Sequence, residues 1–126
     1  MPSLDSLNTL KPLKVGDQTY HYFSLTEAAR QLGDLQRLPM SLKVLLENLL
    51  RWEDGATVTG DDLRAIAQWL GERRSDREIQ YRPARVLMQD FTGVPAVVDL
   101  AAMRAAMAKA GGDPQRINPL SPVCLL

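Results

Sequence analysis

Residues 81–100 constrain the fold of this chain most, because they have the pattern of a buried strand, a tight turn and the start of a helix. Residues 85–88 are a short, continuous apolar run behind an arginine, and Gln89 and Asp90 put two polar side chains at its carboxyl end. In α/β proteins the carboxyl end of such a strand is where ligand-handling groups lie. The segment therefore predicts an α/β fold with polar side chains presented at the strand end.

The residues after this strand predict a turn and then a helix. Phe91-Thr92-Gly93 is expected to turn the chain, with the Thr92 side chain capping backbone N–H groups. Pro95 is expected close to the helix start, where a missing N–H costs nothing. The helix is expected from about residue 94 to residue 110, with small apolar side chains suited to packing against a sheet, and Gly111-Gly112 ends it.

The amino-terminal part of the chain predicts a loose arm and a hairpin. Residues 1–9 show no clear hydrophobic period and are expected to form the arm. Gly16-Asp17 separates two runs of strand-forming residues, 13–15 and 18–22, which is a hairpin signal. His21 lies between two tyrosines in the second run, and we expect a surface strand position there rather than a general base.

Three helices are expected between the hairpin and the strand. Ser24 and Glu27 have the spacing of a capping box, and Gly33 should end the first helix. Pro39 can open the second helix, and Gly55 lies just past its end. Asp61 and Asp62 favour the start of the third helix, which Gly71 should end. The apolar positions of the second helix recur at helical spacing: Leu42, Leu45, Leu46, Leu49 and Leu50.

The carboxyl-terminal residues predict the start of a second strand. Pro114, Pro119 and Pro122 favour an extended loop, and the apolar run 123–126 follows them. Strands joined by a crossover helix pair in parallel, and parallel sheets need cover on both faces. The unit is begun and left unfinished, so we expect this chain to be only part of a fold.

The charge and cysteine content exclude several classes of protein. Fifteen basic and fifteen acidic residues cancel, and the arginines of residues 72–78 alternate with acids, so nothing favours nucleic-acid binding. One cysteine excludes an internal disulfide framework, and neither a signal peptide nor an apolar stretch long enough for a membrane span is evident. We expect a cytoplasmic protein that has no membrane partner.

Three long motifs carry a resemblance to a known family. They are residues 38–51, residues 82–100, and Gly111-Gly112-Asp113 with Ile117-Asn118-Pro119-Leu120-Ser121-Pro122. Together they closely resemble the amino-terminal part of aconitate hydratases, in the branch of bacterial aconitase A and the iron regulatory proteins. The resemblance implies an incomplete part of a three-layer α/β/α iron–sulfur domain. Residues 1–19 would be the arm and first hairpin strand, and residues 20–126 the amino-terminal portion of that domain, truncated.

The resemblance also implies the chemistry of the full-length family. Its members isomerise citrate to isocitrate through cis-aconitate, using a 4Fe-4S cluster that three cysteines hold and whose fourth iron is a Lewis acid. The family's serine base and aspartate–histidine pair have no counterpart here, because the sequence departs from the pattern at Cys124. One family residue carries over: Gln89 matches the glutamine that contacts the substrate. No catalytic residue and no metal ligand is expected in this chain.

Cys124 and the carboxylates Asp90 and Asp99 could each be given a functional role, but a structural role is expected for all three. A lone cysteine cannot hold an iron–sulfur cluster, so Cys124 is expected to be a free thiol. Asp90 is expected to cap the turn and Asp99 to lie within a helix, rather than to form a catalytic carboxylate pair.

The leading functional hypothesis is an amino-terminal fragment of an aconitate hydratase that is inactive by itself. A first alternative is a stand-alone module that associates with itself or with a partner through an open sheet edge and apolar faces. A second alternative is an RNA-binding remnant of the iron regulatory type, which the balanced charge disfavours.

Overall fold

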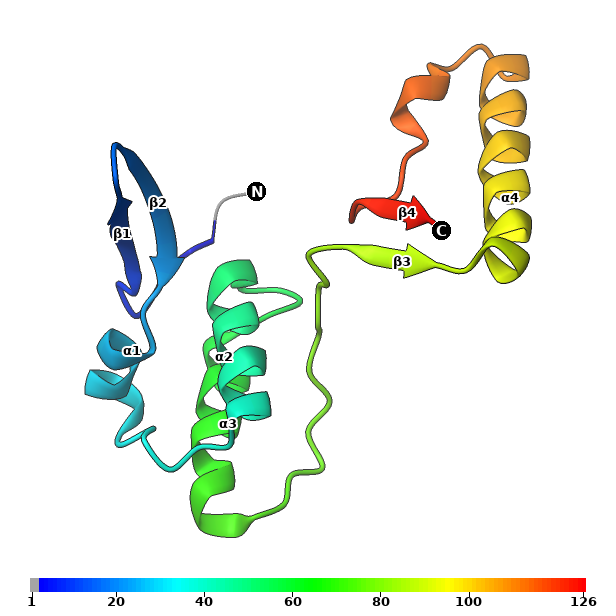
Figure 1. The fold of residues 1–126 in the computed structure, drawn as a ribbon. Helices are drawn as coiled ribbons and strands as arrows, with labels where there is room; N and C mark the ends of the chain where they lie inside the picture. Colours follow the sequence, from blue (N-terminus) through cyan, green and yellow to red (C-terminus); the bar gives the residue numbers. More distant parts are fainter. Residues whose placement is uncertain (1–2) are drawn as a thin grey trace. The chain divides into compact units, whose positions relative to one another are not determined.

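The computed structural model describes residues 3–126, apart from the side chain of Thr92 (Figure 1). The fold is a mixture of helices and strands, as predicted. Contacts along the chain divide it into two compact units, the first ending at Arg82 and the second running from Pro83 to Leu126. The two units are described separately.

The first unit opens with the predicted hairpin. Strands β1 (Leu10–Val15) and β2 (Gln18–Phe23) pair antiparallel, with Leu10 opposite Phe23 and Val15 opposite Gln18. Gly16 has φ +59°, a left-handed value that glycine adopts without strain. Only Phe23 is buried, so the hairpin attaches to the core at its base, and His21 lies on an exposed strand position as predicted.

Residues 3–9 do not form the loose arm that the sequence predicted. Thr9 is fully buried, and its amide and hydroxyl donate to the Asp5 carboxylate at 2.6 and 2.8 Å. The Ser6 hydroxyl donates to the buried Glu53 carboxylate at 2.6 Å, and the Leu4 amide donates to the Glu53 carbonyl at 2.9 Å. The prediction was wrong because polar contacts to distant residues hold this segment, and hydrophobic periodicity does not detect them.

Three helices build the core of the first unit: α1 (Leu25–Leu32), α2 (Met40–Trp52) and α3 (Gly60–Glu72). Leu46, Leu49 and Leu50 of α2 are almost completely buried, as the helical spacing predicted. Burial of each such side chain contributes about 1.5–3 kcal/mol before chain entropy is subtracted. The other buried apolar residues of this core are Phe23, Ala28, Leu35, Leu38, Val58, Leu63 and Ile66.

The helix ends follow the sequence signals in part. Ser24 caps α1 by accepting from the Glu27 amide at 3.3 Å, but the Ser24 amide donates to Thr9 instead of Glu27, so only half of the predicted capping box forms. Gly33, at φ +91°, ends α1. The prediction that Gly71 ends α3 was wrong: α3 continues to Glu72, and Arg73 ends it in a left-handed conformation.

The second unit is a strand, a long helix and a returning strand. Strands β3 (Val86–Met88) and β4 (Val123–Leu125) pair in parallel, with Val86 opposite Val123, which confirms the predicted second strand. Helix α4 (Asp90–Lys109) and the short 3₁₀ helix η1 (Pro114–Arg116) connect them. No helix within the described residues is both long enough and apolar enough to cross a membrane.

Helix α4 begins earlier than the sequence predicted. The helix starts at Asp90, so Phe91-Thr92-Gly93 is its first turn rather than a separate turn. Pro95 is therefore the sixth helical residue, and the Phe91 carbonyl has no amide four residues on to bond. The predicted cap by the Thr92 side chain lies outside the described residues.

Candidate functional site

The candidate site is the junction between β3 and α4, where Gln89 is the N-cap residue. Its φ and ψ of −69° and 147° are extended, and its carbonyl accepts the first helical hydrogen bond from the Gly93 amide at 2.7 Å. The Gln89 side chain is exposed and makes no capping hydrogen bond. A glutamine amide offers two donor hydrogens and an acceptor oxygen, so this side chain can bind a carboxylate.

Gly93 shapes the junction by allowing the strands to approach the helix. A Cβ at this position would overlap Leu125 Cδ1 and would lie 3.2 Å from Met88 Cβ. The glycine is buried, so the first turn of α4 rests directly on β3 and β4. Sequence reasoning assigned Gly93 to a turn and missed this role. The signal for it was a glycine in the first helical turn after a buried strand, where glycine permits close packing of helix on sheet.

The charges at the junction are mixed. Free amide groups at a helix N-terminus favour an anion, whereas the Asp90 carboxylate adds negative charge at the same end. The Asp90 carboxylate accepts from the Phe91 amide at 2.7 Å, a local helix-end role in line with the sequence expectation. Asp99 lies within α4 and is exposed. These two carboxylates lie nine residues apart on one helix, which gives no support to acid–base catalysis by the pair.

The second unit also contains a hollow that is lined mainly by apolar side chains. It measures about 540 Å³ and lies between α4 and the segment before β4. Arg104 holds that segment to the helix, because its Nε donates to the Ile117 carbonyl at 3.0 Å and its guanidinium also contacts the Asn118 side chain. Gln89 does not line this hollow. The apolar lining of the hollow does not suit a ligand that carries several carboxylates.

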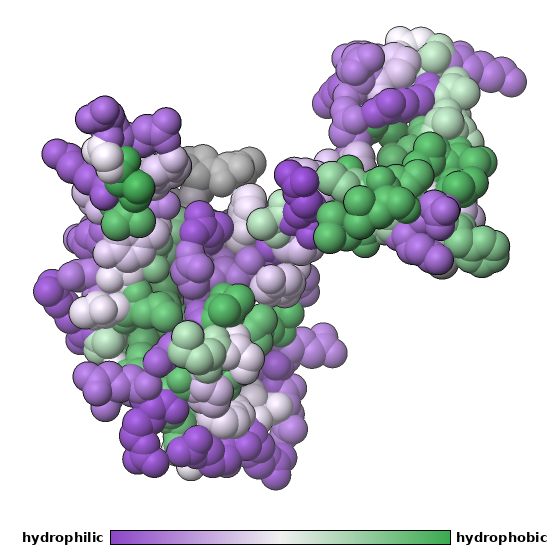
Figure 2. Space-filling model, in the orientation of Figure 1, coloured by the Kyte–Doolittle hydropathy of each residue, from purple (hydrophilic) through white to green (hydrophobic). Residues whose placement is uncertain are grey.

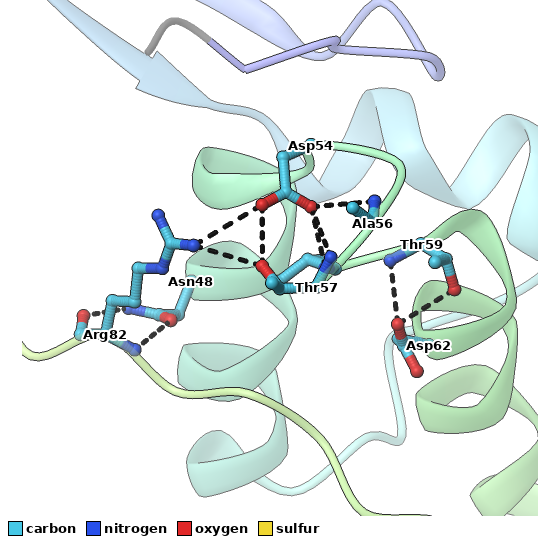
Figure 3. Close-up of polar contacts among 8 residues, drawn as sticks. Asn48, Asp54, Ala56, Thr57, Thr59, Asp62 and Arg82 are labelled. Carbon is cyan, nitrogen blue, oxygen red and sulfur yellow. Dashed lines mark hydrogen bonds and ion pairs between the residues drawn. The ribbon is translucent and has the colours of Figure 1, made fainter.

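The most extensive polar cluster lies in the first unit and is shown in Figure 3. The Asn48 side chain accepts from the Arg82 amide at 3.1 Å and donates to the Arg82 carbonyl at 2.7 Å. The Arg82 guanidinium reaches the Thr57 hydroxyl at 3.0 Å and Asp54 at 3.4 Å, and lies 5.2 Å from the Trp52 ring centre. These contacts tie the segment after α3 back to α2 and its following loop.

Two carboxylates in this cluster have pKa values below their ordinary range. Hydrogen bonds from the Thr57 hydroxyl and from the amides of the same loop hold the pKa of Asp54 well below its usual value. Burial acts to raise the pKa of Asp62, but hydrogen bonds from Thr59 and Arg77 outweigh it and lower that pKa. Each carboxylate is occupied by neighbouring donors, so the cluster stabilises the fold and does not resemble a ligand site.

The described residues do not bring together the side chains that an iron–sulfur cluster would need as ligands. Cys124 is a half-buried free thiol on β4, 3.4 Å from the Arg85 guanidinium. Among the described residues, no three histidine, cysteine, aspartate or glutamate side chains lie together as metal ligands. An iron–sulfur cluster needs several thiolates, and the sequence has one cysteine. The donor set of this chain therefore does not fit such a cluster.

The arginines of residues 72–78 lie on an exposed surface with acids beside them. Arg74 pairs with Asp76 at 2.8 Å, and Arg77 pairs with Asp62 at 2.6 Å. A basic surface suited to a phosphate backbone would leave such arginines free to bind it. These ion pairs indicate that the arginines stabilise the fold rather than bind nucleic acid.

Comparisons with known proteins match this chain to one family. The family model of aconitase (aconitate hydratase) matches residues 62–126. The chain is 83% identical over its full length to aconitate hydratase A of Pseudomonas aeruginosa, and 67% identical over 114 residues to aconitate hydratase A of Escherichia coli. It spans 14% of the length of the first relative and 13% of the second. A third similar protein, aconitate hydratase A of Bradyrhizobium diazoefficiens, is 59% identical over the full chain and is covered to 14%.

Proposed function

This chain belongs to the aconitase family, and on that premise we propose that it supplies the amino-terminal part of an aconitate hydratase. Residues 20–126 would form the amino-terminal portion of the iron–sulfur domain, preceded in residues 1–19 by the amino-terminal segment and the first hairpin strand. The observation that carries the proposal is the 83% identity to aconitate hydratase A of Pseudomonas aeruginosa across all 126 residues. The parent reaction is the isomerisation of citrate to isocitrate in the cytoplasm.

We propose further that Gln89 contacts the tricarboxylate substrate in the complete enzyme. Three features of the junction support this role: the exposed amide, the absence of a capping bond from it, and its position at the carboxyl end of a parallel strand. The amide would bind a carboxylate and orient it, and it would carry no proton in the reaction. Gln89 is therefore a binding residue in this proposal.

The chain by itself is proposed to be inactive. In the family, a 4Fe-4S cluster supplies a Lewis-acid iron for the substrate hydroxyl, and the donor set here does not fit that cluster. The groups that would protonate and deprotonate the substrate are also not identified in this chain. Incubation with iron and sulfide should therefore give neither a 4Fe-4S absorption band nor turnover of citrate.

A chimeric enzyme tests whether this chain can supply the amino-terminal part of an aconitate hydratase. This chain would replace the matching residues of aconitate hydratase A from Pseudomonas aeruginosa, and citrate turnover would be measured. An active chimera is expected because the two sequences are 83% identical there. An inactive chimera that nevertheless folds and binds its cluster would contradict the proposed placement.

Substitution of Gln89 in that chimera tests the residue itself. Gln89→Ala removes one hydrogen bond to a charged group, which is worth about 1.5–3 kcal/mol and so lowers kcat/KM about 10- to 100-fold. Gln115→Ala is the matched control, because Gln115 is also an exposed glutamine of the second unit. Equal kcat/KM values for the two variants would remove Gln89 from the binding site while leaving the family placement intact.

A further inference from the structure

The Arg104 guanidinium holds the segment that leads into β4 against α4. Its Nε donates to the Ile117 carbonyl at 3.0 Å, and a terminal nitrogen donates to the Asn118 side-chain oxygen. Among the described residues, no other hydrogen bond joins α4 to residues 117–122. Two donors of one planar group therefore bind two neighbouring residues at once, a geometry that a lysine ammonium does not reproduce.

Apolar packing does little to hold the same segment in place. The hollow of about 540 Å³ separates Leu100 and Met103 of α4 from Leu120 and Val123 of the returning chain. Figure 2 shows apolar side chains gathered on the surface of the second unit, and among that unit's described residues only Gly93 is buried. The position of the segment beside α4 therefore depends on the contacts of Arg104.

The strand that follows this segment fixes the backbone at Gln89. The Leu126 amide donates at 2.9 Å to the Met88 carbonyl, which belongs to the peptide group between Met88 and Gln89. The peptide group on the other side of Gln89 is held by the Gly93 amide at 2.7 Å. Because peptide groups are planar, fixing both of them fixes φ and ψ of Gln89 and the direction in which its side chain leaves the backbone.

The pairing of β4 with β3 is too short to hold β4 firmly by itself. It extends over three residue pairs, from Val86 opposite Val123 to Met88 opposite Leu125. An isolated pair of short strands is marginally stable, and closing the loop back from α4 costs chain entropy. By fixing residues 117 and 118, Arg104 shortens the free part of that loop to the few residues directly before β4.

We propose that Arg104 is a positioning residue for Gln89. Its contacts with residues 117 and 118 hold β4 against β3, and β4 fixes the backbone from which the Gln89 amide projects. The functional part of this inference rests on the proposed contact of Gln89 with the substrate. A binding group displaced by about 1 Å can cost about 100-fold in rate, so a side chain that does not touch the substrate can affect turnover.

Amide hydrogen exchange in this chain, followed by NMR, tests the structural step. The probe is the Val86 amide, which donates to the Pro122 carbonyl at 2.8 Å. Arg104→Ala should speed exchange there about 10-fold, and Arg104→Lys should give a smaller increase, while amides in α1 keep their rates. Lys109→Ala removes a positive charge from the same helix and is the matched control, expected to exchange like the parent chain. Unchanged exchange at Val86 in Arg104→Ala, or an equal increase in the control, would overturn the proposal.

A double-mutant cycle in the chimeric enzyme tests the functional step. Arg104→Ala should lower kcat/KM for citrate about 3- to 30-fold, and Arg104→Lys should recover part of that loss. When Gln89 is already alanine, Arg104→Ala should change kcat/KM less than about 2-fold, because Arg104 acts through Gln89. A merely structural role would lower activity by the same factor with or without Gln89, and that result would overturn the proposal.

The two measurements also separate this inference from the proposed substrate contact. If Gln89→Ala leaves kcat/KM unchanged, the substrate contact fails, and the functional part of the positioning role fails with it. Exchange at Val86 then still decides whether Arg104 holds β4. If Gln89→Ala lowers kcat/KM and Arg104→Ala adds an independent loss, the substrate contact stands and the positioning role is overturned.

Discussion

Substitution of Asp62 tests how the first unit is held together. Asp62 is only 6% exposed, and its carboxylate forms a reciprocal capping box with Thr59, accepting from the Thr59 amide at 2.7 Å and from the Thr59 hydroxyl at 2.9 Å. The other carboxylate oxygen accepts from Arg77 Nε at 2.6 Å. Asp62→Ala therefore removes three hydrogen bonds and leaves the Thr59 amide without its partner.

The expected loss of stability follows from these contacts. Loss of a helix cap costs about 1 kcal/mol. The amide left without a partner costs a further 1–2 kcal/mol, roughly. The bond to Arg77 adds at most about 1 kcal/mol, because that arginine is partly exposed. We expect Asp62→Ala to lower the unfolding free energy by about 2–4 kcal/mol, which is about 8–30 °C in Tm for a unit of this size.

Urea unfolding followed by tryptophan fluorescence is the appropriate assay. Both tryptophans, Trp52 and Trp69, lie in the first unit, so the signal reports on that unit within the intact chain. Asp61→Ala is the matched control, since the neighbouring carboxylate is exposed and pairs with Arg64 on the surface. The control should change the unfolding free energy by less than about 0.5 kcal/mol. Equal losses in the two variants would refute the role assigned to the capping box.

Three further predictions concern other parts of the chain. Folding lowers the pKa values of Asp54 and Asp62, so the stabilisation that these carboxylates provide is complete above the ordinary pKa of 3.8 and is lost as pH falls below it. The unfolding free energy of the first unit should therefore be flat from pH 7 to about 5 and then decline. A flat profile down to pH 2 would contradict this. Gly93→Ala should destabilise the second unit by about 1–3 kcal/mol through crowding against both strands, measured as a lower midpoint in thermal unfolding by circular dichroism; an unchanged midpoint would show that the strands yield. Asn48→Ala should speed hydrogen exchange at the Arg82 amide, which donates to Asn48, while amides in α1 keep their rates; unchanged exchange at Arg82 would mean that its guanidinium contacts suffice.

Periodic patterns in the sequence predicted the parts of this fold that rest on burial. The leucines of α2 occupy one face at helical spacing, and the three of them that reach the centre are almost fully buried. The hairpin and the parallel pairing of β3 with β4 were also predicted, because turn residues and crossover geometry leave few alternatives. These elements depend on features that recur along the sequence.

The incorrect predictions concern features that depend on single contacts. Phe91-Thr92-Gly93 resembles a turn because of its glycine, yet that glycine serves the contact with Met88 and Leu125 inside α4. The sequence did not predict the order of residues 3–9, because that order depends on a contact with the carboxylate of Glu53, far along the chain. For the candidate site, Gln89 came from resemblance to a family, because one polar residue at a strand end carries little signal by itself.

The register of the small parallel sheet bears on the order in which the chain folds. Val86 pairs with Val123, 37 positions later, whereas the hairpin of the first unit closes over a two-residue turn. Closing a long loop costs chain entropy before any strand contact repays it, so distant pairing is slow. On the ribosome, the helices and hairpin up to Arg82 have left the exit site while β4 is still unmade. We therefore expect the first unit to mature before the second, and β3 to gain its partner strand only after β4 has been synthesised.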